Sequence, residues 1–243
     1  MKIIKLSAID STNSYLKELS KKEDLEDGLI VVAKAQTNGR GQLGSTWQSE
    51  VEKSLTFSMF KRFSKVSISQ QSGITFAVSL ALKTALDRLQ IQEIAIKWPN
   101  DIMSYQKKLA GILVENQVQG AQLTNSVIGV GLNVNEAKFS GLPQATSMFL
   151  STGQTYNLDE VLAVVSEAVL KQLKRLEAGS FLLMKEEYEE TLFRKNEIMV
   201  FEDVVGRRFN GIVRGVAETG ELLLETEADG VQRFQHKEIK MLF

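Results

Sequence analysis

The sequence predicts an α+β fold in two parts. Across residues 1–195, segments with the period-two pattern of strands are interspersed with segments that carry an apolar stripe at helical spacing. From Asn196 onward the chain shows short strand-like runs separated by glycines. Its 243 residues, 43% of them hydrophobic, are enough to bury a full core. We therefore expect one domain at 1–195 and a second, β-barrel-like domain at 196–243, which is small enough to need packing against the first.

The pattern of apolar residues locates the individual elements. Strands are expected at 3–6, 29–35, 54–60, 93–97, 107–115 and 125–134, and in the smaller part at 198–201, 208–217, 221–225 and 231–235. Helices are expected after the capping residues 10–13 and at about 71–89, 157–179 and 180–195. Asn157 opens its helix with a capping box, and Gly179 ends that helix.

A glycine-rich loop follows the strand at 29–35 and is the most distinctive stretch of the chain. It runs from Gln36 to Trp47 and contains Gly39, Arg40, Gly41 and Gly44. Glycine allows backbone N–H groups to approach a ligand closely, and successive amides can form a nest for an anion. Arginine adds a permanent charge with a planar fork. Such a loop suits a ligand with a carboxylate or a phosphate, although an ordinary glycine-rich turn remains an alternative.

Two familiar glycine motifs resemble this loop but do not fit it. The dinucleotide fingerprint needs a helix after the glycines and an acidic residue about 20 positions later. Here a strand-like run follows, and no Asp or Glu occurs between Lys53 and Leu86. In the phosphate-loop pattern, Ser45 stands where the lysine belongs. The loop therefore indicates an anion-binding function of another kind.

Composition excludes several classes of chemistry. The chain has no cysteine, which removes disulfides, thiolate metal sites and thioester intermediates. The single histidine, His236, lies near the C-terminus and is expected on the surface. A net charge of −1 gives no basic field for nucleic acid. The sequence shows neither a run of 18 apolar residues nor a signal peptide, so the expected location is cytoplasmic.

Polar residues gather at two further places. Pro99 biases Trp98 away from helix, so the strand at 93–97 ends in a turn that concentrates Lys97, Asn100 and Asp101. A solvated turn with a charge pair is the alternative. Glycines 129 and 131 interrupt the strand at 125–134, which is unfavourable unless another group must approach closely.

Four segments, taken in order, resemble the biotin–protein ligases (biotin–[acetyl-CoA-carboxylase] ligases). They are Ser11–Asn13, Gln36–Trp47, Lys97–Asp101 with Lys108–Glu115, and Gly129–Val134. The similarity extends over nearly the whole chain. Because the first segment comes so early, the chain resembles the monofunctional class without an N-terminal DNA-binding domain. The resemblance implies a class II synthetase-like catalytic domain with a mixed β-sheet and flanking helices, and a small SH3-like C-terminal domain.

The resemblance also implies roles for individual residues. Lys108 matches the family's essential lysine, and Arg40 would bind the biotin carboxylate and the α-phosphate. The biotin site would comprise Ser11, Thr12, Asn13, Gln36, Gly39, Arg40, Lys108 and Gly111, and the ATP or adenylate site Gly41, Gln42, Trp47, Lys97, Asn100, Asp101 and Asn133. Asp101 would hold Mg²⁺ with ATP. Gln42 and Ser45 replace arginines that many relatives carry, which weakens the expected hold on phosphate.

The implied activity is ATP-dependent ligation of biotin to a lysine of a biotin carboxyl carrier protein, through biotinyl-5′-AMP. Two alternatives remain: a lipoate–protein ligase, and a non-catalytic regulator that binds biotinyl-AMP. DNA binding and membrane association are not expected. The sequence does not identify the carrier protein and leaves the oligomeric state open, a homodimer included.

Overall fold

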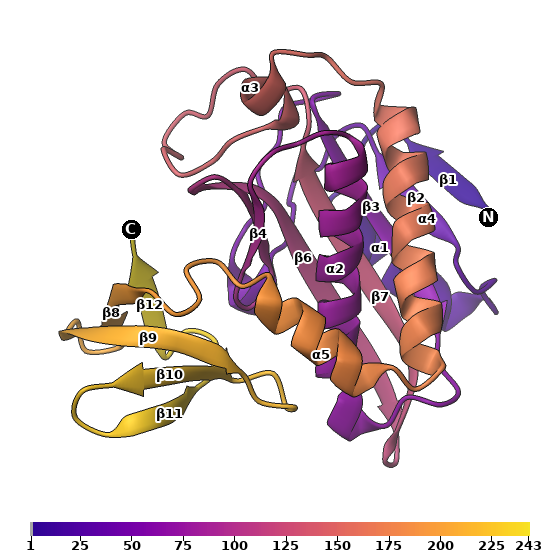
Figure 1. Ribbon diagram of the computed structural model, residues 1–243. Helices are drawn as coiled ribbons and strands as arrows, with labels where there is room; N and C mark the ends of the chain where they lie inside the picture. Colours follow the sequence, from indigo (N-terminus) through magenta and orange to yellow (C-terminus); the bar gives the residue numbers. More distant parts are fainter. Residues whose placement is uncertain (1) are drawn as a thin grey trace.

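The computed structural model describes residues 2–243, in which a large mixed sheet is covered by helices and a separate small sheet lies at the C-terminal end (Figure 1). Within these residues the large sheet has the order β1-β2-β3-β7-β6-β5-β4. Its strands are β1 (Ile3–Leu6), β2 (Ile30–Ala33), β3 (Ser54–Arg62), β4 (Ile94–Lys97), β5 (Asp101–Ser104), β6 (Lys107–Gln119) and β7 (Gln122–Asn133). Strands β1 and β2 are parallel and the other neighbours antiparallel, so the predicted mixed sheet is confirmed.

Helices cover both faces of this sheet. On one face α2 (Ser72–Arg88) packs beside α4 (Leu158–Glu177), with α5 (Phe181–Glu190) crossing next to α2 (Figure 1). Helix α1 (Thr12–Lys22) lies against β3 and β7 on the other face. The two apolar clusters use alternate residues of one strand: Met59 faces the large cluster, and Phe60 faces the cluster beneath α1. A short helix, α3 (Met148–Thr152), follows β7.

The C-terminal part is a small antiparallel sheet of order β11-β10-β9-β8-β12, which confirms the all-β expectation. Its strands are β8 (Ile198–Asp203), β9 (Arg208–Val216), β10 (Leu222–Thr226), β11 (Gly230–Phe234) and β12 (Ile239–Leu242). Buried residues such as Phe201 and Leu224 belong to the same core as the large sheet. Trp98 Nε1 donates to the carbonyl of Gly220 at 2.8 Å, so the small sheet packs directly on the larger part.

One predicted boundary was wrong and two strands were missed, each for a tertiary reason. The helix expected at 180–195 ends at Glu190, because the chain then bonds to β4: Ile96 N donates to the Thr191 carbonyl, and Phe193 N donates to the Ile96 carbonyl, both at 2.8 Å. Strands β5 and β12 were not expected. Each has only four residues. Strand β5 is held by pairing with β4 and β6, and strand β12 is held by pairing with β8.

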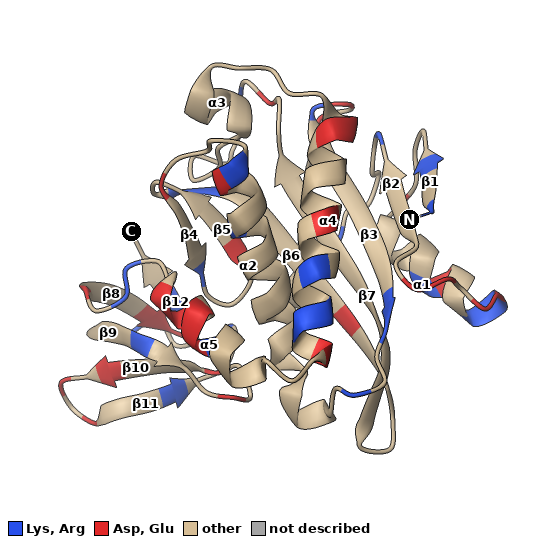
Figure 2. Cartoon of the chain, turned by 45° about the vertical axis from the view of Figure 1, so that its right-hand side comes forward, with Lys and Arg blue, Asp and Glu red and all other residues tan. Residues whose placement is uncertain are grey.

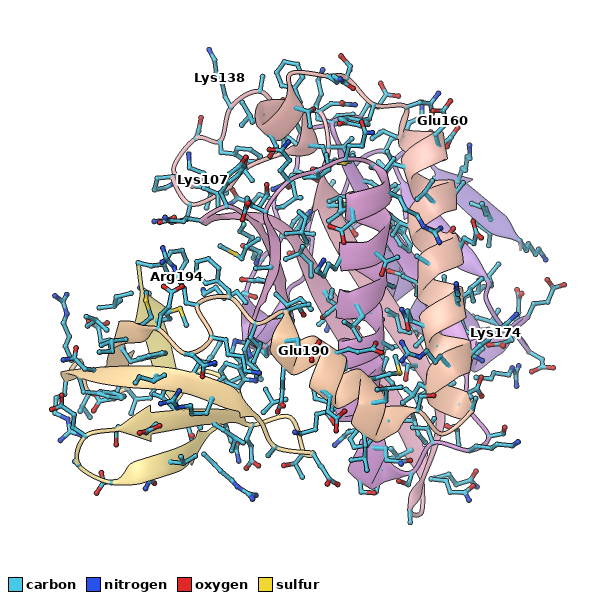
Figure 3. The ribbon with its side chains drawn as sticks, in the orientation of Figure 1. Lys107, Lys138, Glu160, Lys174, Glu190 and Arg194 are labelled. Atoms are coloured by element: carbon cyan, nitrogen blue, oxygen red, sulfur yellow. The ribbon has the colours of Figure 1, made fainter. Side chains whose placement is uncertain are left out.

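Charged side chains lie mainly on the outer surface. Figure 2 shows helix α4 with acidic residues at its start and basic residues near its end, an arrangement that the helix dipole favours. The labelled side chains of Lys107, Lys138, Glu160, Lys174 and Glu190 are exposed (Figure 3). Among residues 2–243, none of the helices is long and apolar enough to cross a membrane.

Candidate active site

A cavity of about 230 Å³ opens where the glycine-rich loop and the first turn of α1 meet strands β6 and β7. Most of the predicted site residues line it, although they come from distant parts of the chain. They are Ser11, Thr12, Asn13, Gln36, Arg40, Gly41, Gln42, Trp47, Asn100, Asp101, Lys108 and Gly111. Gly39, Lys97 and Asn133 do not line this cavity.

A buried chain of polar groups forms one end of the cavity. Thr12 donates from its backbone N–H to Gln36 Oε1 at 2.8 Å, and its hydroxyl lies 3.1 Å from the same oxygen. Ser58 Oγ on β3 lies 2.8 Å from the Thr12 hydroxyl and 2.5 Å from Asn13 Oδ1. The side chain of Ser11 accepts from Ser14 N at 3.4 Å, so it caps α1 and also lines the cavity.

Sequence reasoning missed Ser58. The available signal was the run of hydroxyl residues at every second position of β3, Ser54, Thr56 and Ser58, which places them on one face of the sheet. All three are buried.

The glycine-rich loop folds into a narrow hairpin beside this polar chain. Gly41 N donates to the Ser45 carbonyl at 2.7 Å, and Trp47 N donates to the Gly39 carbonyl at 2.9 Å. A Cβ on Gly39 would lie 2.4 Å from the Trp47 carbonyl oxygen, so the two arms are too close for any side chain there. The glycines therefore allow the two arms of the loop itself to lie close together. At its tip, the carbonyl of Leu43 accepts from Lys237 of the C-terminal part.

Two glycines of β7 allow close approach, as expected. A Cβ on Gly131 would lie 2.4 Å from Cε2 of Trp47, and one on Gly129 would lie 2.3 Å from Asn13 Oδ1. The Trp47 ring thus lies against the strand at the floor of the cavity. Its Nε1 is buried and has no hydrogen-bond acceptor among residues 2–243.

The two predicted catalytic cations are each paired with a carboxylate. Lys108 Nζ lies 2.7 Å from Asp101 Oδ1 and 5.8 Å from the centre of the Trp47 ring. Arg40 contacts Glu115 of β6, with Nη1 3.2 Å from Oε2 and Nη2 3.1 Å from Oε1. Glu115 had no predicted role, because nothing in the local sequence connects it to a loop 75 residues away.

Three predicted nucleotide-site residues serve other contacts. Asn100 Nδ2 donates to the Ile112 carbonyl at 2.6 Å, and Asn133 Nδ2 donates to the Thr146 carbonyl at 2.9 Å. Both amides therefore brace backbone, Asn133 with its side chain buried. Lys97 lies over the ring of Phe243 at 4.9 Å, and burial lowers its pKa below the usual value.

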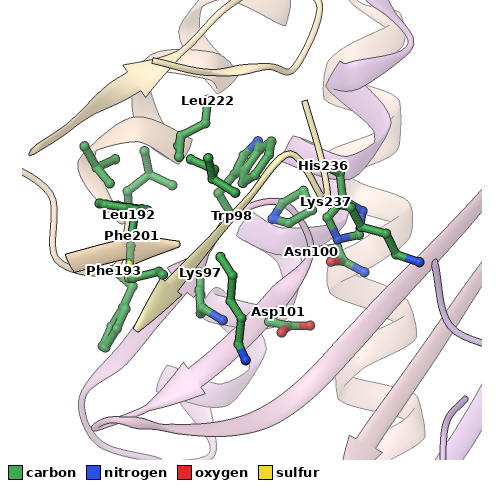
Figure 4. Close-up of a pocket in the computed structure, with 15 residues that line it drawn as sticks. Lys97, Trp98, Asn100, Asp101, Leu192, Phe193, Phe201, Leu222, His236 and Lys237 are labelled. Carbon is green, nitrogen blue, oxygen red and sulfur yellow. The ribbon is translucent and has the colours of Figure 1, made fainter. Parts of the chain in front are cut away.

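Lys97 lines a second cavity of about 450 Å³ between the large sheet and the C-terminal sheet (Figure 4). Figure 4 shows Lys97, Asp101 and His236 around it. The surface position expected for His236 was wrong: this side chain is half-buried, lines both cavities and packs edge-on against Trp98 at 6.1 Å. Burial lowers the pKa of His236, and the nearby Asp101 opposes that shift.

A resident metal site is not built into the described residues 2–243, which contain no cluster of three His, Asp or Glu side chains suited to a metal. Asp101 is the carboxylate that lines the 230 Å³ cavity, and it is already paired with Lys108. Oxygen-preferring Mg²⁺ usually keeps several waters and binds through one or two carboxylates and substrate phosphates. This donor set fits an ion that arrives with a nucleotide.

Known proteins are similar to this chain in both sequence and fold. A profile described as the biotin/lipoate A/B protein ligase family matches residues 6–133. The bifunctional ligase/repressor BirA of Salmonella typhimurium is 30% identical over 234 residues, which is 93% of this chain and 69% of that protein. The biotin–[acetyl-CoA-carboxylase] ligase of Paracoccus denitrificans is 26% identical over 92% of this chain and 94% of its own length. The biotin protein ligase from Aquifex aeolicus in complex with biotin and ATP superposes with a TM-score of 0.82 at 27% identity, covering 99% and 98% of the two chains.

Proposed function

The chain belongs to the biotin/lipoate A/B protein ligase family, and from that premise we propose that it is an ATP-dependent biotin–protein ligase. It activates biotin as biotinyl-5′-AMP and transfers the biotinyl group to a lysine of a biotin carboxyl carrier domain. The observation that carries the proposal is one cavity that joins a buried polar chain to the paired cations Arg40 and Lys108.

The polar chain matches the ureido ring of biotin. That ring has two N–H donors and one carbonyl acceptor, and the cavity offers hydroxyls and amides from Thr12, Gln36 and Asn13. A site built to pair such groups rejects a ligand that lacks them by roughly 10⁴-fold or more, since its own polar groups would stay unpaired. The dithiolane ring of lipoate has no N–H or carbonyl, so this end of the cavity favours biotin.

The cations match the charge that develops in the reaction. In the first step an oxygen of the biotin carboxylate attacks the α-phosphorus of ATP, and pyrophosphate leaves. Arg40 and Lys108 hold the two anions together, which is the main electrostatic requirement of this step. Asp101 is the residue that would hold Mg²⁺ brought in with the phosphates, and the ion would neutralise further negative charge there. Lys97 and His236 line the adjoining cavity, where they would contact the departing pyrophosphate.

In the second step the amine of the carrier lysine attacks the acyl carbon, and AMP leaves with the electron pair of the broken C–O bond. No side chain of the protein becomes covalently attached, which is consistent with a chain without cysteine. Residues of the glycine-rich loop line the cavity, and closure of this loop over the ligand would keep water from the mixed anhydride. We assign the chemistry to a domain at 1–195 and loop contact to a domain at 196–243, which reaches Leu43 through Lys237.

ATP–pyrophosphate exchange with purified protein and Mg²⁺, in separate reactions with biotin and with lipoate, tests the proposal. Exchange with biotin alone is the expected result. Exchange with lipoate alone would keep the adenylation step and overturn the ureido assignment. Tight biotin binding without exchange would instead indicate a non-catalytic binder of biotinyl-AMP.

A further inference from the structure

We propose that Glu115 is a positioning residue for Arg40: it holds one edge of the guanidinium group so that the other edge serves the anionic substrate. This role rests on the proposed function, because it assigns the substrate carboxylate and α-phosphate to Arg40.

Glu115 gathers donors from two separate segments onto strand β6. Its carboxylate accepts from Arg40 Nη1 and Nη2 at 3.2 and 3.1 Å, from Asn13 Nδ2 at 3.1 Å and from Lys17 Nζ at 3.0 Å. The Glu115 side chain is 16% exposed, so these contacts are sheltered from solvent. Burial alone would raise the pKa of Glu115, but hydrogen bonds from Lys17, Asn13 and Arg40 outweigh it and hold the pKa below its usual range. The carboxylate is therefore ionised at neutral pH.

The contacts use a defined edge of the guanidinium group. Arginine has five N–H donors in a rigid fork. Nη1 of Arg40 faces Glu115 and also Ser14 Oγ at 3.2 Å, while Nη2 gives one hydrogen to Glu115. The Nε–H and the second hydrogen of Nη2 have no partner within the described range, residues 2–243. These two N–H groups form the parallel pair that binds a carboxylate or phosphate in bidentate fashion.

Arg40 lies between two hollows, so one edge of its guanidinium group can be held while the other faces the substrate. It lines the 230 Å³ cavity and also an outer hollow of about 380 Å³ that contains Glu115. Glu115 thus holds the guanidinium from the outer side while the residue still faces the cavity. Because Arg40 sits on a hairpin loop, an untethered side chain would sample many rotamers, and holding it in advance lowers the entropy lost on substrate binding.

Lys17 explains why the contact between Glu115 and Arg40 still leaves a net positive charge that attracts an anion. A carboxylate paired with Arg40 alone would cancel its charge. Here one carboxylate faces two cations, Lys17 and Arg40, so the group keeps a net positive charge. Lys17 does not line the cavity, which makes it a natural control.

Limited proteolysis tests the tether without any ligand. Trypsin cleaves after Arg40 once that side chain leaves Glu115, and mass spectrometry follows the rate. Glu115→Gln should raise this rate about fivefold, the effect of losing a well-formed ion pair. Lys17→Met should leave it unchanged, since the Arg40 contacts remain. Equal cleavage of Glu115→Gln and the wild type, at equal thermal midpoints, would overturn the proposal.

A double-mutant cycle in pyrophosphate exchange tests the role in the reaction. Rates are measured at saturating biotin. A loss of biotin affinity caused by disturbing Asn13, which also contacts Glu115, then does not affect the measured rate. Glu115→Gln should lower kcat about tenfold in the wild type and have no further effect in an Arg40→Ala background, because the two act as one unit. Glu115→Asp should recover part of the loss.

The two possible failures can be told apart. Absence of biotin-dependent exchange in the wild type would overturn the proposed function and the role of Glu115 with it. Normal wild-type exchange with additive losses in the cycle would overturn the role of Glu115 alone.

Discussion

Ser11, Thr12 and Ser58 at one end of the cavity are at most 3% exposed, whereas the side chains of Arg40 and Lys108 at the other end are 41% and 39% exposed. The polar end is built on a helix start and a central strand, and its groups bond to one another. The charged end is built on a loop and a strand rim, and each cation is paired with a carboxylate. The polar groups are thus fixed in the core before any ligand binds, while the two charged side chains stay accessible from solvent.

This difference predicts that changes at the charged end alter rate with little effect on folding. Lys108→Ala should lower adenylation by roughly 10²–10³-fold, as for the loss of one preorganised charge contact. Its pair with Asp101 is partly exposed, so the free energy of unfolding should change by less than about 1 kcal/mol. Pyrophosphate exchange and urea unfolding measure the two effects. A folded variant with near-normal exchange would remove Lys108 from the mechanism.

Alanine substitutions at two glycines of β7 test the two ends of the cavity separately. Gly129→Ala places a methyl group 2.3 Å from Asn13 Oδ1, which is held by Ser58 and cannot move aside freely. Biotin affinity should fall by roughly 10–100-fold, as expected for overpacking of 1–3 kcal/mol. Titration calorimetry with biotin measures this.

Gly131→Ala is the matched variant for the charged end. Its methyl group would displace the Trp47 ring, so tryptophan fluorescence and the exchange rate should change more than biotin affinity. If both glycine variants weakened biotin binding equally, the two ends would not be separable.

A smaller effect is expected at the tip of the glycine-rich loop. Gln42 lines the cavity, and Ser45 Oγ donates to the Gln42 carbonyl at 2.8 Å, so the tip is closed without a charged side chain. Gln42→Arg adds a cation near the phosphate and should slow release of the adenylate about two- to fivefold. A stopped-flow chase of preformed biotinyl-AMP measures the release rate. Unchanged release would show that the added charge does not reach the phosphate.

The sequence predicted the elements whose own pattern defines them. Strand β1 and the helices α2 and α4 lie within two residues of the expected bounds, because periodicity determines them locally. Strands β5 and β12 were not predictable, since four residues paired to neighbours carry no pattern of their own.

The same limit applies to the site. Sequence motifs predicted the loop and Lys108 as site residues, and in the structure both line one cavity. Ser58 and Glu115 act on partners 46 and 75 residues away, and His236 comes from the C-terminal part. Their roles depend on which segments the fold brings together, and one sequence does not contain that information.

The last prediction concerns a carboxylate that lies outside both ends of the cavity. Glu136 is 2% exposed, accepts from Ser54 Oγ, and has a second oxygen without a partner among residues 2–243. Burial raises the pKa of Glu136, so the fold favours the neutral carboxyl. Stability should therefore fall as the pH rises from the ordinary carboxyl value through the raised one, because the folded state must then hold a buried charge.

Glu136→Gln should remove this dependence and stabilise the protein at pH 8 by about 1 kcal/mol, with exchange unchanged. Urea unfolding at pH 5 and pH 8 measures the slope for both proteins. Glu115 and Asp101 pair with the cations Arg40 and Lys108, and their substitution should change the exchange rate. Glu136 forms no ion pair with another residue of the described range 2–243, and its substitution should change stability alone. A loss of exchange in Glu136→Gln would mean that the buried region behind Ser54 is coupled to the charged end, and the separation of the two ends would fail.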